Sequence, residues 1–233
     1  MGLDVHVMPL TRYLGGQFQI PLEKILGSQV TRVGTAKPEN EEDRVREYLR
    51  TLKEQLVREA GASDPEWDET GEPILGVQYT YRAYTDLRGF AAYQDYPKKA
   101  GWFSKMIVPF RIEEDPVKYS GFAGICGKGK PTAYSHLIIH ADTHGYWVPV
   151  RFKHPVMVDR ESYLVVGSSI VLLEELDRLG SLLEMSRDWG EIGKGGEVCA
   201  DGDPLGSVKY GWSVLHYAAR MSVQHRQPII FDG

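Results

Sequence analysis

The stretch Ser162-Tyr-Leu-Val-Val-Gly-Ser-Ser-Ile-Val-Leu-Leu-Glu-Glu-Leu176 changes its hydrophobic period partway along. Its first part, residues 162–167, is a short apolar run that predicts a buried strand. After Ser168 and Ser169, leucines recur at the three- and four-residue spacing of one helix face. Either serine can cap that helix through its hydroxyl. The stretch therefore predicts a strand that runs directly into a helix.

In the rest of the chain, predicted helices and strands occur in no regular order. Further helices are predicted over residues 39–60, 84–96 and 207–225, and strands over residues 3–10 and from Pro228 onward. Gly61 is placed to end the first of these helices in the left-handed conformation. Because the elements do not alternate regularly, we expect an α+β fold with a mixed or mostly antiparallel sheet and about four helices. One domain, residues 1–233, is the expected organisation.

The remaining segments are predicted from their turn and breaker residues. We expect a short helix over 18–26, an edge strand over 106–112, a mobile acidic loop near 61–75 and a glycine-rich linker over 190–206. Residues 133–152 predict a hairpin, with apolar arms Tyr134–Ala141 and Tyr146–Phe152 around a turn at 142–145.

The amino-acid composition and charge argue against some classes of function. The 233 residues carry a net charge of −5, which argues against nucleic-acid binding through clustered positive charge. Residues 39–72 carry 12 acidic and 5 basic side chains, and residues 161–203 carry 10 acidic and 3 basic. The two cysteines are too few for a disulfide framework, and neither a signal peptide nor a membrane helix is indicated. We expect a reduced, cytoplasmic protein that does not contact the membrane.

The segment His136-Leu-Ile-Ile-His140-Ala-Asp142-Thr-His144 offers candidate metal ligands. Imidazoles and carboxylates are the ligands that Zn²⁺ and Mn²⁺ accept in hydrolase sites. His140 and His144 could converge across the turn with Asp142, which would make a divalent metal site at these three residues. Asp142 has an alternative role, because an Asp in this turn position accepts hydrogen bonds from turn amides. Apart from such a metal, no cofactor is expected.

A second group of side chains suits a small anionic or aromatic ligand. Gly124 to Lys130 follows the spacing of a phosphate loop, but Pro131 replaces the Ser or Thr that would hold Mg²⁺. A flexible basic loop is therefore the favoured interpretation. The predicted helix start at the two serines is a second place for an anion. The candidate ligand-binding residues are Tyr146, Trp147, Arg151, Lys128, Lys130, Ser168 and Ser169.

Two segments resemble parts of small uncharacterised bacterial proteins. They are His140-x-Asp142-x-x-Gly145-Tyr146-Trp147-x-Pro149 and Val165-Val166-Gly167-Ser168-Ser169-x-x-Leu172-Leu173-Glu174-Glu175-Leu176. The resemblance implies a bacterial cytosolic origin and carries no activity with it.

Three functional hypotheses follow from the sequence. The first is a non-catalytic cytoplasmic protein-interaction domain, for example an immunity-like partner of a toxin, because the net charge is acidic, the predicted helix has an acidic face at 39–59 and no catalytic set is recognisable. It implies another protein as partner, and neither nucleic acid nor membrane. The second is a metal-dependent hydrolase centred on the 136–144 segment. The third is a small-molecule binder with an aromatic pocket.

Overall fold

Six strands form one sheet in the computed structural model, which describes residues 3–15, 41–98, 110, 120–140, 144–159, 164–186 and 202–232. Across the sheet the strands are β2 (Leu75–Tyr79), β1 (Leu3–Val7), β6 (Ile229–Asp232), β3 (His144–Val148), β5 (Leu164–Ser168) and β4 (Val156–Asp159). β3 and β5 run parallel, and the other neighbours run antiparallel. The predicted α+β fold with a mixed sheet is confirmed.

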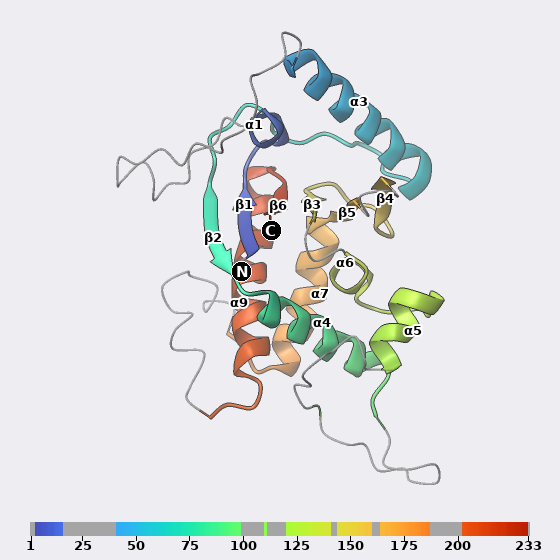
Figure 1. Ribbon diagram of the computed structural model, residues 1–233, viewed down its shortest axis with the longest axis vertical. Helices are drawn as coiled ribbons and strands as arrows, with labels where there is room; N and C mark the ends of the chain where they lie inside the picture. The colour runs from blue at the N-terminus through green and yellow to red at the C-terminus, as the bar shows by residue number, and fades with distance from the viewer. Residues whose placement is uncertain are drawn as a thin grey trace, which may run out of the picture.

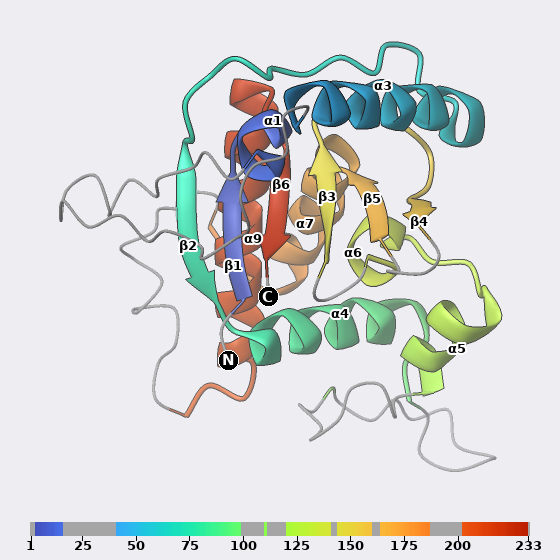
Figure 2. The same ribbon diagram turned by 45° about the horizontal axis from the view of Figure 1, so that its top comes forward.

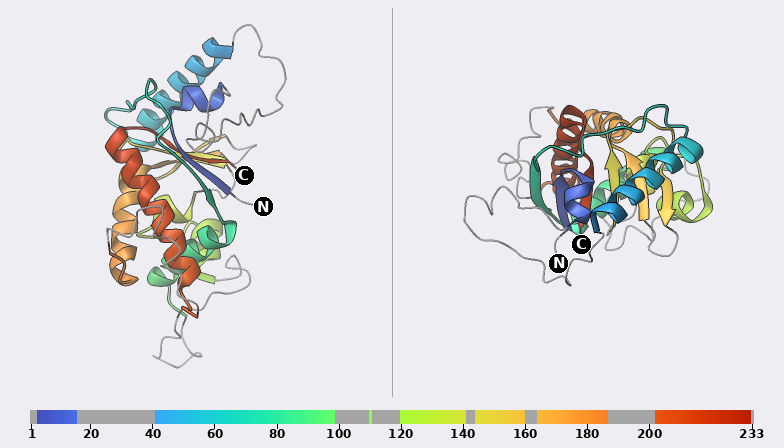
Figure 3. Two further views of the ribbon diagram at one scale, coloured as in Figure 1. Left: turned by 90° about the vertical axis from the view of Figure 1, so that its left-hand side faces the viewer. Right: turned by 90° about the horizontal axis from the view of Figure 1, so that it is seen from above.

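Helices cover both faces of this sheet (Figure 1). In the described residues they are α1 (Leu10–Leu14), α3 (Glu41–Ala60), α4 (Tyr81–Asp95), α5 (Ser120–Lys128), α6 (Ser135–Ile138), α7 (Ser169–Leu182) and α9 (Gly206–His225). α3, α4, α7 and α9 are the long ones, with 14 to 20 residues each. Figures 2 and 3 show α3 on one side of the strands and the pair α7 and α9 on the other.

The sheet separates two apolar cores. On one face, α4, α7 and α9 pack against strand residues that include Trp147 and Phe231. On the other face, α3 and α1 pack against strand residues that include Tyr146 and Ile230. Successive residues of a strand point to opposite faces, so the neighbours Tyr146 and Trp147 enter different cores. The elements thus form three layers with the sheet in the middle.

One stripe of α3 holds this helix on the sheet. Leu49, Leu52 and Leu56 are buried there, as their three- and four-residue spacing predicts. The helix ends before Gly61, which has a φ of +68°, and the amide of Ala62 donates to the carbonyl of Leu56 at 3.2 Å. The positive φ of Gly61 confirms the predicted left-handed glycine at the end of this helix. The opposite side of α3 is left to the solvent.

The predicted strand that runs directly into a helix is also confirmed. β5 runs into α7, and the Ser168 hydroxyl accepts a hydrogen bond from the Val171 amide at 3.2 Å. Gly167 lets the strand pass close to Trp147, because a Cβ at this position would lie 2.4 Å from the indole Cδ1. A larger residue would therefore collide with the core of this face.

Two local predictions are wrong. The hairpin over 133–152 does not form: residues 135–138 are the helix α6, and β3 pairs with β5 and β6 instead. The apolar character of residues 134–140 arises because this short helix is buried against α4 and α7. The expected basic loop at 124–130 is also largely helical, since α5 continues to Lys128.

Some predictions fall outside the described residues. They are the helix over 18–26, the turn residues 141–143, nearly all of the edge strand at 106–112 and most of the linker at 190–206. No helix in the described part of the chain has the length and apolar character needed to cross a membrane.

Candidate functional site

Where the structure describes the predicted metal ligands, they contact protein groups and do not form a metal site. His140 is fully buried, its ring stacks on Trp147 with centroids 3.4 Å apart, and its Nε2 lies 3.2 Å from the Tyr146 carbonyl oxygen. Asp142 and the His144 side chain lie outside the described residues. Within the described residues, no cluster of three or more His, Cys, Asp or Glu is arranged to hold a metal ion. Binding of Zn²⁺ or Mn²⁺ at 140–144 stays a prediction.

His136 belongs to a buried polar cluster around α6. The Glu175 carboxylate accepts the backbone amides of His136 at 3.0 Å and Leu137 at 2.8 Å. The His136 Nδ1 accepts the Ser168 amide, and the Trp147 indole donates to the His136 carbonyl, both at 2.9 Å. Burial raises the pKa of Glu175 to about 8 and lowers the pKa of His136 to about 4. The cluster supplies hydrogen-bond partners to a helix in the interior, which is a structural task.

The buried members of the predicted ligand site do not form one pocket. Tyr146 and Trp147 fill opposite cores, as described above. Ser168 caps α7, and the Ser169 hydroxyl accepts a hydrogen bond from Ser222 at 2.8 Å. Both serines are fully buried, so the start of α7 is occupied by the protein's own hydroxyl groups.

The cationic members of that set lie on separate segments. Arg151 follows β3 and forms an ion pair with Glu174 of α7. Lys128 is the last residue of α5. Lys130 lies over the ring of Tyr96, with its ammonium 5.1 Å from the ring centroid. Each of the three cations therefore has different surroundings, and ligand binding by them stays a prediction.

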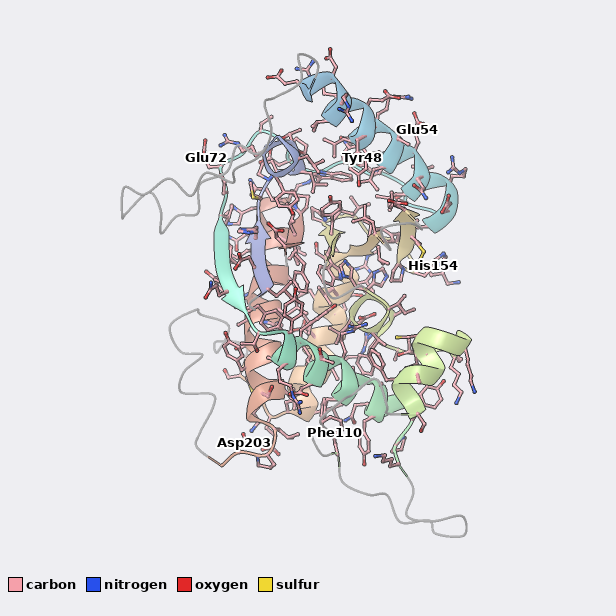
Figure 4. The ribbon with its side chains drawn as sticks, viewed as in Figure 1. Tyr48, Glu54, Glu72, Phe110, His154 and Asp203 are labelled. Carbon is pink, nitrogen blue, oxygen red and sulfur yellow. The ribbon has the colours of Figure 1, made fainter. Side chains whose placement is uncertain are left out.

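Exposed carboxylates occur along α3 and on residues 61–72, the segment that follows it. We call these residues the carboxylate face: Glu42, Asp43, Glu47, Glu54, Glu59, Asp64, Glu66 and Glu72, all of them exposed. At 100° per residue, Asp43, Glu47 and Glu54 point away from the buried leucine stripe. Figure 4 labels two members, Glu54 on α3 and Glu72 near α1.

The segment 61–72 is anchored beside α3, which Figure 2 shows in outline. Trp67 is buried in the core under α3, and Lys53 of α3 lies over its ring at 4.9 Å. The same lysine bonds to Glu66 at 2.6 Å. On the other side, the Asp68 amide donates to the Arg226 carbonyl at 2.7 Å. These contacts fix the positions of the carboxylates on the segment relative to those on the helix.

Ion pairs run along the helical part of the carboxylate face. Arg50 donates to Glu47 at 2.5 Å and to Glu54 at 2.6 Å. The hydrogen bond from Arg50 lowers the pKa of Glu47, so this carboxyl is ionised at neutral pH. α3 holds six acidic and five basic residues, whereas residues 61–72 hold five acidic residues and no basic one. The face therefore combines a mixed-charge helix with a purely acidic segment.

Comparison with known proteins points to nucleic-acid mimicry. A family model described as "Putative DNA-mimic protein" matches residues 25–231, which is nearly the whole chain and includes the carboxylate face. Among curated proteins and solved structures, no significant match was found.

This match corrects the functional hypotheses drawn from the sequence. The metal-dependent hydrolase centred on 136–144 and the small-molecule binder with an aromatic pocket are both wrong, because a DNA mimic is a protein-binding type of protein. The match supports the expected protein partner of the first hypothesis but not its immunity-like example. The exclusion of nucleic acid from the function was also wrong as stated. Negative charge does oppose binding to DNA, but it is the property by which a protein can take the place of DNA on a partner.

Sequence reasoning took the acidic helix face at 39–59 as an argument for a protein partner. It treated residues 61–75 as a mobile loop, apart from the helix. The signal that links them is Trp67, a large apolar residue in the middle of a polar segment, which the structure places under α3.

Proposed function

The chain belongs to this family of DNA-mimic proteins, and on that premise we propose that it binds a DNA-binding protein on the surface with which this partner contacts DNA. The carboxylate face would take the place of phosphates there. Lysine and arginine side chains of the partner would pair with carboxylates in place of phosphate oxygens. While the complex persists, the partner is kept from DNA.

The observation that carries the proposal is the fixed array of exposed carboxylates on one layer of the fold. Glu47 and Glu54 lie two helical turns apart, about 10 Å along the axis of α3. Asp64 and Glu66 are placed beside this helix by the anchored segment. Because both parts are held by packing, little conformational entropy is lost when a partner binds.

One apolar side chain accompanies the charges. Val57 of α3 is 48% exposed, among the few large hydrophobic residues at the surface of the described chain. Protein interfaces combine an apolar contact with a charged surround. Val57 therefore offers a protein partner an apolar contact beside the carboxylates.

The DNA-binding proteins that such a mimic would meet lie in the cytoplasm of a bacterium, so we place the protein there. The resemblance of the 140–149 and 165–176 segments to bacterial proteins supports this placement. Association should be steered by charge, so the affinity should fall as added salt shortens the Debye length from about 30 Å at 0.01 M to about 8 Å at 0.15 M.

Capture and elution test the proposal. The immobilised chain is exposed to a bacterial lysate, and bound proteins are eluted with a 20-bp DNA duplex. We expect an eluted protein that binds the duplex itself and that the wild-type chain displaces from it. The double variant Glu47→Gln/Glu54→Gln should bind this protein about tenfold more weakly, since each exposed charge pair contributes modestly.

A matched control removes the same charge elsewhere. Glu174→Gln/Glu184→Gln changes two exposed carboxylates of the α7 region and should leave the affinity within about twofold. If duplex DNA elutes nothing that binds DNA, or if the two double variants behave alike, the proposal is wrong.

A further inference from the structure

Arginines are interleaved with the carboxylates of α3, which distinguishes this helix from a row of phosphates. Arg46, Arg50 and Arg58 are exposed, at 71%, 59% and 70% of their side-chain surface. Arg46 lies 3.5 Å from both Glu42 and Asp43, and Arg58 lies 3.0 Å from Glu59. Together with the bridge that Arg50 makes between Glu47 and Glu54, these pairs engage every described carboxylate of the helix.

DNA offers no such cations. Each strand of a duplex presents a phosphate about every 3.4 Å along the axis, and its counterions are mobile and released on binding. On α3 the counterions are guanidinium groups attached to the same helix, which cannot be released. A purely basic ligand must therefore compete with Arg50 for both of its glutamates and is repelled by the arginine itself.

The same arginines suit a partner with a different charge pattern. Proteins that read base sequence place Asp or Glu among their cations, because a carboxylate accepts a hydrogen bond from the cytosine amino group. A guanidinium on the mimic presents N–H donors that such a carboxylate can accept. The charge order along the outer side of α3 is acidic at Glu47, basic at Arg50, acidic at Glu54 and basic at Arg58, which complements cations that alternate with carboxylates.

Resting on the proposed function, we propose that Arg46, Arg50 and Arg58 set the selectivity of the carboxylate face. They weaken the binding of generic polycations. They favour sequence-reading DNA-binding proteins whose DNA-contacting surface holds carboxylates between its cations. Stabilising the helix is a weaker explanation, because exposed pairs at this spacing add little to stability.

Deca-arginine peptide is the probe for the first half of this proposal. Its affinity is measured by fluorescence anisotropy at low salt for the wild type, for Arg50→Gln and for Arg46→Gln/Arg50→Gln/Arg58→Gln. We expect about threefold tighter binding for the single variant and about tenfold for the triple variant. Arg151→Gln is the matched control, since Arg151 is 60% exposed and also pairs with a glutamate. It should change the affinity by less than twofold. Equal effects of Arg50→Gln and Arg151→Gln would overturn the proposal, because net charge alone would then explain them.

The DNA-binding protein recovered by duplex elution tests the second half. Arg50→Gln should weaken its binding about tenfold although the face becomes more negative, and Arg50→Lys should fall between the two. Unchanged or tighter binding of Arg50→Gln would overturn the inference. Loss of binding by Glu47→Gln/Glu54→Gln without loss by Arg50→Gln would reject only this inference. Full binding by the glutamine double variant would reject the proposed function itself. Circular dichroism confirms that each variant retains its helix content.

Discussion

On one face of the sheet, α4, α7 and α9 pack together over a large core; on the other face, α3 covers a smaller core and turns a charged side outward. The first face buries polar side chains as well, including Asp86, Glu175 and His216. Their bonds join different helices: Asp86 accepts Ser207 of α9 at 2.7 Å, and His216 of α9 lies 3.0 Å from Asp177 of α7.

The two faces differ in what their residues do. Those on the first face stabilise the fold, whereas those on the outer side of α3 are exposed to solvent. Buried hydrogen-bonded groups specify how three helices fit together and leave little room for variation. The α3 layer needs one leucine stripe and Trp67 for its attachment, so its outer residues are free to serve recognition. Changes on the first face should therefore reduce stability, and changes on the outer side of α3 should alter binding at constant stability.

The largest expected effect is the loss of Trp147. Its indole is fully buried, stacks on His140 and bonds to the His136 carbonyl. Trp147→Ala should lower the unfolding free energy by about 3–5 kcal/mol in urea titrations. Trp67→Ala should cost less, about 2 kcal/mol, because the segment 61–72 can detach locally while the sheet persists. Equal losses would show that the two layers are not energetically different.

Glu175 should make stability depend on pH. Its pKa is raised to about 8 in the folded protein, so the folded state holds a proton that the unfolded state releases above about 4.5. Stability from this group is full below that value and is lost as the pH rises towards 8. His136, with its pKa lowered to about 4, acts oppositely and only below about 6.5.

Between pH 6.5 and 8 the proton occupancy of Glu175 still changes, whereas His136 is already neutral, and the Glu175→Gln variant separates its contribution from that of other groups. We expect the unfolding free energy of the wild type to fall there by about 1 kcal/mol per pH unit, and Glu175→Gln to lack this slope. The variant is less stable overall, because glutamine cannot accept both backbone amides. Parallel pH profiles for wild type and variant would contradict the assignment.

Substitutions at the helix ends should lower the unfolding free energy by an intermediate amount in both layers. Ser168→Ala removes the side-chain cap of α7 and should cost about 1 kcal/mol. Gly61→Ala forces an alanine to a φ of +68° with no neighbour within 4 Å of the new methyl group, so strain alone should cost about 1 kcal/mol. Thermal unfolding of both variants measures the two caps directly, and a cost above about 3 kcal/mol for either would indicate a role beyond capping.

The smallest effect on stability is expected from the carboxylate face. Glu47→Gln/Glu54→Gln should leave the Tm unchanged within error, since both side chains are more than half exposed. A clear drop in Tm would mean that these residues stabilise the fold. The contrast between a stabilising face and an exposed recognition surface would then be wrong.

Elements with a strong period could be predicted from the sequence. The stripe of α3 and the junction from β5 to α7 follow from leucine spacing and from one glycine or serine at the helix end. The segment 134–141 was misread because α6 has four residues, three of them buried, and a burial pattern this short fits strand and helix equally. What holds α6 comes from Glu175 and Arg88, distant in sequence, whose side chains bond to its amides and to the Ile138 carbonyl.

The proposed binding surface was only partly predictable from the sequence. Charge counting located the acidic residues over 39–72, but composition does not say which way a surface acts. An acidic face is compatible with many protein partners, and the proposal of a DNA-binding partner depends on the family match. The pairing of segment 61–72 with α3 depends on Lys53, Glu66 and Trp67 meeting in space, which no local pattern encodes.

Carboxylate footprinting tests the central claim most directly. The chain is labelled with a carbodiimide and an amine, alone and with the DNA-binding protein recovered by duplex elution, and modified residues are located by mass spectrometry. The account predicts that the partner protects Glu47, Glu54 and Asp64, and that Glu174 and Glu184 label equally in both samples. Protection of Glu174 and Glu184 with unchanged labelling of Glu47 and Glu54 would contradict it.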